Sequence, residues 1–410
     1  MIYNFTRGKD FAPKSSFNVS HLSGLKVLEL ASVLAGPGVG QFFAELGADV
    51  IKVENLKTNG DVTRSWKSAG EQTDDRSAYF CSVNWGKRSI AIDLTVPEGQ
   101  SIVQNLASKV DIVIASYKPG DASKLNVDYK TLSAENSRLI YGQVTGYGSD
   151  NPRVGYDAII QAEAGFMFMN GEPGGPSLKI PVALMDVLAG HHLKEGLLLA
   201  LLQRAATGKG SFVEVSLLQA AVASLANQAS NWLVANKLPK KQGSAHPNIA
   251  PYGDVFETSD RKEVILAIGS DQQFHALCRL LGLNDLTTDP RFVKNASRVE
   301  NRGALNDVLK NRMAHIDAQV FLDQANEAKI PAGIINDMKQ VFEMPEARDL
   351  LIKSPEIKGV KTYVGQPQLE SDSHLLPPPH FGENTADVLI NFLNLSAEEV
   401  KKLVLGGVVI

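Results

Sequence analysis

The chain has 410 residues, of which 44% are hydrophobic and 21% are charged. This is an ordinary globular composition, and the length suits two domains or one large domain with a smaller satellite. The formal net charge of −4 provides no general attraction to nucleic acid or to an anionic membrane, so neither is predicted as a partner.

The two cysteines, Cys81 and Cys278, lie far apart in the chain, which indicates a reducing compartment. Alternatively, either cysteine serves as a small buried hydrophobic residue. No apolar run reaches the roughly 18 residues that a membrane helix needs. Residues 1–24 contain no apolar signal-peptide stretch, and Asp10 argues against a mitochondrial transit peptide, which remains an alternative. We interpret residues 1–24 as an N-terminal arm and expect a cytoplasmic protein.

The first 150 residues alternate between strand and helix patterns. Residues 25–31 (LKVLELA) form a short apolar run typical of a buried strand, and residues 49–54 (DVIKVE) predict a second one. Between them a glycine- and proline-rich turn precedes a helix-like stretch at residues 41–46. Further strands are predicted at residues 88–94 and 110–115. Such alternation predicts a doubly wound α/β domain with a parallel sheet.

Beyond Asp186 the pattern changes. Residues 187–204 and 212–234 are rich in Leu and Ala, which predicts two long buried helices. The predicted organisation is an arm at residues 1–24, the first part of a large domain at 25–236, a linker at 237–251, a small α/β domain at 252–328 that opens with a hairpin, and a return of the chain to the large domain at 329–410.

Gly36, Gly38 and Gly40 follow the first predicted strand and invite comparison with a dinucleotide-binding loop. The fingerprint G-x-G-x-x-G requires a third glycine where this chain has Gln41, and Pro37 removes a backbone donor. NAD or FAD binding is therefore not favoured. A tight turn without a ligand and a loop that accepts a ligand by close backbone approach both remain.

Eight sequence blocks together resemble the family III CoA-transferases, the group that contains formyl-CoA:oxalate and carnitine CoA-transferases. They occur in family order at residues 25–54, 60–66 (GDVTRSW), 84–94, 115–120 (ASYKPG), 144–148 (VTGYG), 155–165, 185–210 and 381–389 (FGENTADVL). The resemblance implies a large Rossmann-like α/β domain, built from both ends of the chain, with a smaller domain inserted between them. It also implies an interlocked homodimer.

The resemblance assigns the catalytic nucleophile to Asp186, which precedes a helix of small residues ending in T-G-K-G. A carboxylate at the first turn of an apolar helix is favoured by the free N–H groups and the helix dipole, which suits a nucleophile. A simple helix cap is the alternative. His191 and His192, on the same predicted helix, are interpreted as core or interface residues. No His, Cys or acidic cluster has metal-ligand spacing, so no metal is predicted.

Coenzyme A and its acyl esters are expected as substrates, with no tightly bound cofactor. The positions that match CoA-contacting sites of the family are Val33, Ala35, Asn55, Ile92, Thr95, Ser116, Tyr117, Lys124, Thr145 and Tyr147. Several of these sites are basic in relatives, whereas Asn55, Thr95 and Thr145 are neutral. Lys124 is therefore the preferred phosphate partner and Tyr117 the preferred adenine platform.

The expected activity is transfer of CoA from an acyl-CoA donor, such as succinyl-CoA, to a small carboxylic or dicarboxylic acid through aspartyl anhydride and aspartyl-CoA intermediates. Arg64 and Arg88 are candidates for holding the distal carboxylate of the acceptor. An α-methylacyl-CoA racemase needs a second acid/base, and the histidine of racemases is replaced by Tyr156. Asp157 and Gln161 are assigned either to the site or to structural hydrogen bonds. A non-catalytic CoA-binding protein is the remaining alternative.

Overall fold

The computed structural model describes residues 22–365 and 375–410, so most of the predicted N-terminal arm lies outside the described residues. The chain forms two compact units. The first comprises Met1–Val154, Asp186–Ser216 and Leu350–Ile410, and the second comprises Gly155–Met185 and Leu217–Asp349. The chain thus leaves the first unit twice, for Gly155–Met185 and for Leu217–Asp349, and returns to it finally at Leu350. The domain boundaries at residues 236 and 329 stay a prediction.

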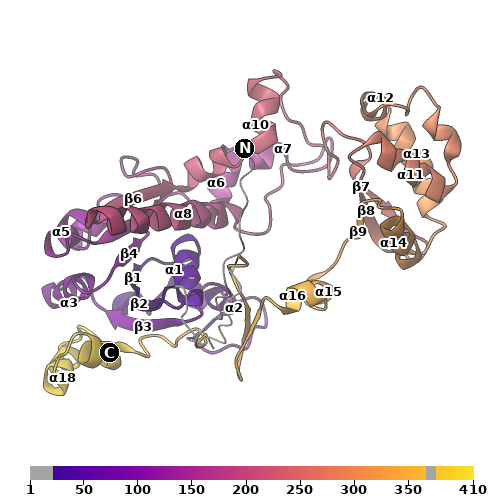
Figure 1. Ribbon diagram of the computed structural model, residues 1–410. Helices are drawn as coiled ribbons and strands as arrows, with labels where there is room; N and C mark the ends of the chain where they lie inside the picture. Colours follow the sequence, from indigo (N-terminus) through magenta and orange to yellow (C-terminus); the bar gives the residue numbers. More distant parts are fainter. Residues whose placement is uncertain (1–21, 366–374) are drawn as a thin grey trace, which may run out of the picture. The chain divides into compact units, whose positions relative to one another are not determined.

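A six-stranded sheet lies at the centre of the first unit (Figure 1). All its strands are parallel and follow the order β3-β2-β1-β4-β5-β6, the order of a doubly wound sheet, so the predicted α/β architecture is confirmed. The strands are β1 (Lys26–Leu30), β2 (Asp49–Asn55), β3 (Lys87–Ile92), β4 (Ile112–Ala115), β5 (Ile140–Thr145) and β6 (Ser211–Ser216).

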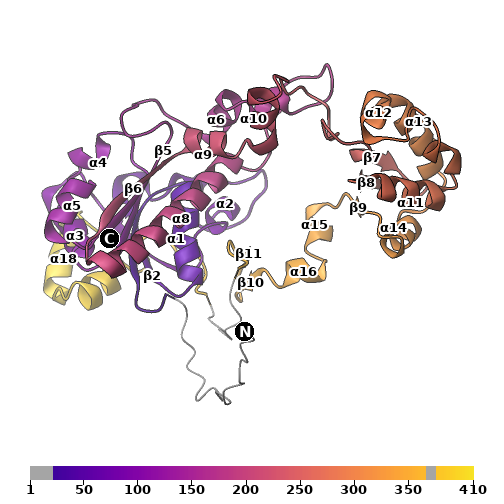
Figure 2. The same ribbon diagram turned by 45° about the horizontal axis from the view of Figure 1, so that its top comes forward.

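Two helical layers cover this sheet. One contains α3 (Pro97–Ala107), α5 (Tyr129–Glu135) and α18 (Ala397–Leu405), whose apolar side chains share a buried core with Leu28 and Leu30 of β1. The other contains α1 (Ala35–Glu45) and the 24-residue α8 (Leu184–Thr207), which lie side by side (Figure 2). Strand side chains alternate between the two faces, so residue 29 faces α1.

The glycine-rich segment after β1 is helical, and the expectation of a turn or ligand loop there is wrong. Gly36 and Gly40 lie within α1. A Cβ atom on Gly36 would lie 2.4 Å from the Cβ of Ala31, and one on Gly40 would lie 1.8 Å from Oε2 of Glu29. These glycines therefore allow α1 to pack closely on β1, rather than forming a phosphate loop.

The prediction of a second long helix, at residues 212–234, is also wrong. Its first residues form the edge strand β6, and the remainder forms α9 (Leu217–Ala223) and α10 (Ala226–Leu233). The burial of β6 alternates along SFVEVS, which is the period of a strand with one exposed face. The high Leu and Ala content that follows concealed this short period. The first predicted helix, at residues 187–204, is confirmed by α8.

A cluster of buried charges crosses the α1 face of the sheet. Glu29 of β1 forms ion pairs with Lys52 of β2 at 2.9 Å and with Lys87 of β3 at 2.8 Å. Lys52 also pairs with Asp61 at 2.9 Å. Burial by itself lowers the pKa of Lys52, but Asp61 and Glu29 outweigh it and hold the pKa above its ordinary value. Burial dominates at Lys87 and lowers its pKa to about 8.

The C-terminal segment completes the first unit by covering β3. The side chains of Asn384 and Thr385 accept hydrogen bonds from the backbone N–H groups of Ser89 and Ala91, at 2.9 and 3.1 Å. The N–H of Asp93 donates to the carbonyl of Val408, and Ile92 forms a bridge with Val409. The edge of the sheet is thereby protected.

The second unit contains a small antiparallel sheet, β7 (Tyr252–Glu257), β8 (Glu263–Ala267) and β9 (Ala332–Ile334), and the predicted hairpin is confirmed by β7 and β8. Its helices α11 (Asp271–Leu281), α13 (Arg302–Met313) and α14 (Ala318–Glu327) enclose a separate hydrophobic core. Residues 237–251, the predicted linker, contain no helix or strand and lie within the second unit. Among the described residues, no helix has the length and apolar character needed to cross a membrane.

The remaining elements are short. Those of the first unit are α2 (Ala78–Cys81), α4 (Asp121–Lys124), the hairpin β10 (Leu351–Lys353) and β11 (Lys358–Val360), α17 (Thr385–Asp387), the 3₁₀ turns at Leu56–Thr58 and Val62–Ser65, and the π-helical turn at Val388–Phe392. Those of the second unit are α6 (Asp157–Glu163), α7 (Phe166–Met169), α12 (Asn295–Glu300), α15 (Met338–Val341), α16 (Pro345–Arg348) and the 3₁₀ turn at Asn284–Thr287.

Candidate active site

A cavity of about 970 Å³ opens at the carboxyl ends of the parallel strands in the first unit. Its walls come from Ala31 and Ser32 after β1, from the end of β2 with the segment that follows it, and from Ser116 and Tyr117 after β4. Strands β1 and β4 are neighbours at which the strand order reverses, and ligands of doubly wound folds bind at this switch point. The cavity is therefore the candidate ligand site.

Four of the ten predicted CoA contacts line this cavity: Asn55, Thr95, Ser116 and Tyr117. They come from the ends of three strands that are distant in sequence, and the fold brings them together. The Oγ of Ser116 accepts a hydrogen bond from the N–H of Ser32, which joins the β1 and β4 sides of the wall. Burial raises the pKa of Tyr117 to about 12, so its phenol stays neutral at physiological pH.

The other predicted contacts do not line the cavity. Ile92 is fully buried in the hydrophobic core, and Lys124 is exposed and paired with Asp121 at 2.8 Å. Thr145 donates to Glu214 and accepts from the N–H of Gly148. Tyr147 packs under the guanidinium of Arg153. Val33 and Ala35 lie directly after the cavity-lining Ser32, on the way into α1.

Arg64 and Glu54 form the floor of the cavity and attach the C-terminal segment to it. The guanidinium of Arg64 makes two hydrogen bonds to the Glu54 carboxylate, at 2.6 and 2.8 Å, and one to the carbonyl of Pro379 at 3.1 Å. Glu54 also accepts from Ser89 and from the N–H of Asp61. Arg64 is thus already engaged by carboxylates, and the sequence-based role in holding an acceptor carboxylate is not supported.

Arg88 is placed away from the cavity. It lies near the start of β3, whereas the cavity opens at the strand ends, and it pairs with Asp49 at 2.5 Å and Asp387 at 3.2 Å. Its suggested role in binding the acceptor is likewise not supported.

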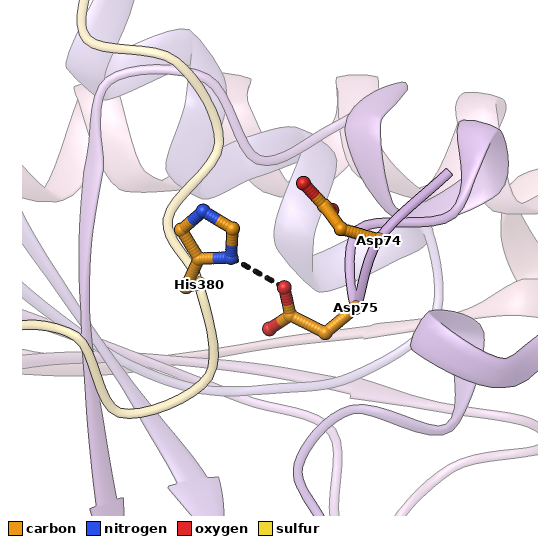
Figure 3. A group of neighbouring side chains, drawn as sticks. All are labelled: Asp74, Asp75 and His380. Atoms are coloured by element: carbon orange, nitrogen blue, oxygen red, sulfur yellow. Dashed lines mark hydrogen bonds and ion pairs between the residues drawn. The ribbon is translucent and has the colours of Figure 1, made fainter. Parts of the chain in front are cut away.

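Asp74, Asp75 and His380 meet at the rim of the cavity (Figure 3). His380 forms a short hydrogen bond with Asp75, which also accepts the N–H of Phe381 at 2.7 Å. Burial alone raises the pKa of Asp75, but the bonds from Phe381 and His380 outweigh it, so the pKa falls below its usual range. This group thus fixes Phe381, which lines the cavity.

A metal ion at these three residues would have to displace existing partners. Both oxygens of Asp74 are bound by Arg76, whose hydrogen bonds lower the pKa of Asp74 to about 2. Asp75 is held by Arg64 as well as by Phe381. The donor set is therefore already committed to arginines and a backbone amide, and we interpret it as a clamp on the C-terminal segment.

Lys67 and Phe381 are among the cavity-lining groups that were not identified from the sequence. Lys67 is exposed, and its ammonium donates to the carbonyl of Thr73 at 2.5 Å. Unlike Lys52 and Arg64 in the same wall, it forms no ion pair with a carboxylate of the described residues, so it suits a phosphate. Phe381 reaches the cavity from the far end of the chain. Sequence spacing carries no signal for either, because both depend on how distant segments meet.

Asp186 lies in the first turn of α8 and is partly buried. Gly190, one helical turn later and on the same face, packs against the start of α1, where a Cβ atom would lie 3.3 Å from the carbonyl oxygen of Ala35. Ala35 follows the cavity-lining Ser32 by three residues. The predicted nucleophile is therefore on the helix that crosses the segment leading out of the cavity.

Asp157 and Gln161 make structural hydrogen bonds. One Asp157 oxygen accepts the N–H of Met185 at 2.9 Å, and the other accepts from Gln161 at 2.8 Å. The N–H of Ile180 donates to Gln161 at 2.8 Å. Of the two roles left open by the sequence, the structure shows this one. Asp157 holds the residue immediately before Asp186. His191 is exposed and so is not a core residue of this chain.

Comparison with known proteins now identifies the class. The model of CoA-transferase family III matches residues 22–385. The succinate–glutarate CoA-transferase of Agrobacterium fabrum is 37% identical over 385 residues, which cover 90% of this chain and 94% of the relative. The human succinyl-CoA:glutarate CoA-transferase is 33% identical over a stretch that covers 97% of this chain and 92% of the human protein. A CaiB/BaiF family protein from Brucella suis has a TM-score of 0.79 at 39% identity and covers 90% of this chain and 98% of its own.

The protein is accordingly a CoA-transferase of the α/β type, an enzyme whose substrates are CoA esters and carboxylic acids. More narrowly, the chain belongs to CoA-transferase family III, the CaiB/BaiF family, as the sequence resemblance predicts.

We predict that Tyr117→Ala weakens CoA binding about tenfold, because loss of an aromatic base-stacking platform costs on the order of 1–3 kcal/mol. Tyr117→Phe keeps the ring and should bind within about twofold of the wild type. Tyr147→Ala is the matched control, since Tyr147 is another family-matched tyrosine but does not line the cavity. Isothermal titration with CoA measures all four proteins. Equal weakening by both alanine substitutions would contradict the assignment of Tyr117.

Proposed function

We propose that the enzyme transfers CoA by covalent catalysis at Asp186, with CoA bound in the cavity at the ends of β1, β2 and β4. The observation that carries the proposal is the packing of α8 against the start of α1. It places the helix of Asp186 on the segment that continues from cavity-lining Ser32. Tyr117 is assigned to the adenine and Lys67 to a phosphate, in place of the exposed, paired Lys124.

The proposed reaction consists of four displacements. A carboxylate oxygen of Asp186 attacks the thioester carbon of the donor, the C–S bond breaks, and CoA leaves as thiolate. This first step leaves a mixed anhydride between Asp186 and the donor acyl group. The thiolate then attacks the aspartyl carbon of this anhydride, which releases the donor acid and leaves an aspartyl-CoA thioester. The acceptor carboxylate expels the thiolate from this thioester, and the thiolate attacks the acyl carbon of the acceptor. Asp186 is released as carboxylate, and no proton is gained or lost overall.

The proposed acceptor is a short dicarboxylic acid, and the proposed donor is succinyl-CoA. The two curated relatives named above act, by name, on succinate, succinyl-CoA and glutarate. Segments 243–256 and 270–274 resemble the same branch. We expect kcat/KM with succinyl-CoA to be at least tenfold higher for glutarate than for oxalate or carnitine, measured by mass spectrometry of the CoA products. A preference for oxalate or carnitine would contradict this choice of acceptor.

We also propose that the enzyme is a homodimer. Leu199 and Leu202 of α8 are 67% and 69% exposed, and Leu233 and Val234 at the end of α10 are 75% and 81% exposed. Exposed apolar side chains in these numbers suit a subunit interface. Sedimentation analysis should give a dimer that persists at low micromolar concentration, and Leu199→Asp combined with Leu202→Asp should shift it towards monomer. A monomer in the wild type would contradict the proposal.

The nucleophile is tested with Asp186→Asn, which keeps the size of the side chain but removes its attacking oxygen anion. We expect transfer to fall by at least 10³-fold while CoA binding stays within about threefold. Wild-type enzyme incubated with acyl-CoA should carry a CoA or acyl adduct that peptide mass spectrometry maps to Asp186. Asp157→Asn is the comparison, because it retains the nucleophile and should still form the adduct. Full turnover in Asp186→Asn would exclude the mechanism.

A further inference from the structure

Residues 31–34 connect the CoA cavity with the segment that packs on the helix of Asp186. Ala31 and Ser32 line the cavity, and α1 begins directly after Leu34. The carbonyl of Ala35 lies against Gly190 of α8. A shift of this four-residue loop would therefore move a wall of the cavity and the surface beneath the proposed nucleophile together.

Val33, in the middle of this loop, adopts a left-handed backbone conformation with φ of 73°. The side chain of a β-branched residue collides with its own backbone in this region, so valine is rarely found there. Its backbone is strained, and strained conformations persist only where surrounding contacts hold them.

Besides the hydrogen bond of Ser32 to Ser116, the loop is held by two buried charged residues, Lys52 and Asp61. Both oxygens of the Asp61 carboxylate lie 3.3 Å from the N–H of Val33, and the ammonium of Lys52 donates to the carbonyl of Ala31 at 2.8 Å. Lys52 and Asp61 pair with each other at 2.9 Å, and both side chains are almost fully buried. The Lys52–Asp61 ion pair thus fixes the backbone on both sides of Ser32, at Ala31 and at Val33.

The negative charge of Asp61 is required for its contacts with Val33 and Lys52. One of its oxygens already accepts from the N–H and hydroxyl of Thr63, at 3.1 and 2.8 Å, and the other faces the ammonium of Lys52. Three donor groups, two from Thr63 and one from Lys52, therefore face the Asp61 carboxylate in addition to the N–H of Val33. An amide at this position would turn its NH2 group towards one of these donors, so it cannot replace the carboxylate.

We propose that Asp61 and Lys52 are positioning residues, which hold residues 31–34 in the strained conformation that binds the CoA thioester beside Asp186. They act through the backbone of Val33 and Ala31 rather than by contacting the reacting atoms. This assignment rests on the proposed function, because it takes CoA as the ligand of the cavity.

Asp61→Asn tests the assignment in combination with Val33→Gly. Glycine adopts positive φ without a steric cost, so the loop no longer needs Asp61 to stay in place. We expect Asp61→Asn alone to raise the Kd for CoA about tenfold. In the Val33→Gly background, the same change should raise it less than threefold. Val33→Ala in place of Val33→Gly is the matched control, because alanine is still disfavoured at φ of 73° and should give no such rescue.

Isothermal titration with CoA gives the Kd of each variant, and circular dichroism with thermal unfolding shows whether each is folded. If Asp61→Asn does not fold, the same comparison is made with Asp61→Glu, which keeps the charge that Lys52 requires but displaces the carboxylate from Val33. An effect of Asp61 that is equally large with valine and with glycine at position 33 would overturn the proposal, as would wild-type affinity in the single variant.

The outcome is separable from the test of Asp186. If the wild type does not bind CoA, the proposed function fails and this assignment fails with it. If the wild type binds CoA but glycine at position 33 gives no rescue, the positioning role alone is wrong and the covalent mechanism is unaffected.

Discussion

The ion pairs of Glu29 with Lys52 and Lys87 are the interaction on which the first unit depends. All three side chains are buried on the α1 face of the sheet, on three adjacent strands. Removing a charge from water is costly, so each must remain paired, and a lost partner would leave an uncompensated charge in the core. Gly40 is part of the same arrangement, because a side chain there would occupy the space of the Glu29 carboxylate.

A second buried pair, Glu54 with Arg64, joins the ends of the chain. Glu54 ends a central strand, while the partners of Arg64 include the carbonyl of Pro379, more than three hundred residues away. Ser89 contributes to both, since its hydroxyl donates to Glu54 and accepts the N–H of Gly382. The C-terminal segment therefore forms part of the cavity wall and does not merely cover the sheet edge.

Local patterns predicted the parts of the fold that local patterns determine. The strands at residues 25–31 and 49–54 were found from short apolar runs, because both faces of a parallel sheet are buried. The glycines of α1 were misassigned for a physical reason. Glycine is normally a weak helix former, and its use here for close packing on Ala31 and Glu29 is a tertiary effect that local propensity cannot reveal. Strand β6 was missed because six alternating residues preceded a long Leu- and Ala-rich stretch.

In the candidate site, too, some residues were predicted from the sequence and others depend on tertiary contacts. Asn55, Thr95, Ser116 and Tyr117 were predicted from the family resemblance, and they line one cavity because parallel strands bring their carboxyl ends to one edge. Lys124, which the sequence favoured for phosphate, pairs with Asp121 outside the cavity, and Lys67 occupies the wall instead. Residue type alone did not separate these two lysines, because their difference lies in which partner each one meets.

Asp186, the proposed nucleophile, lies on a different element from the strand-end loops that line the cavity. In the proposed mechanism the carboxylate must approach a thioester carbon, while the cavity at the strand ends holds most of the CoA molecule. Only a fixed path between the two regions keeps the reacting atoms within near-attack distance. Here Val33 and Leu34 lead from Ser32 to the start of α1, and Gly190, one turn after Asp186 on α8, lies against the carbonyl oxygen of Ala35. Asp157 fixes the backbone of Met185 from the other direction along the chain. The backbone around the proposed nucleophile is therefore held on both sides, at Gly190 and at Met185.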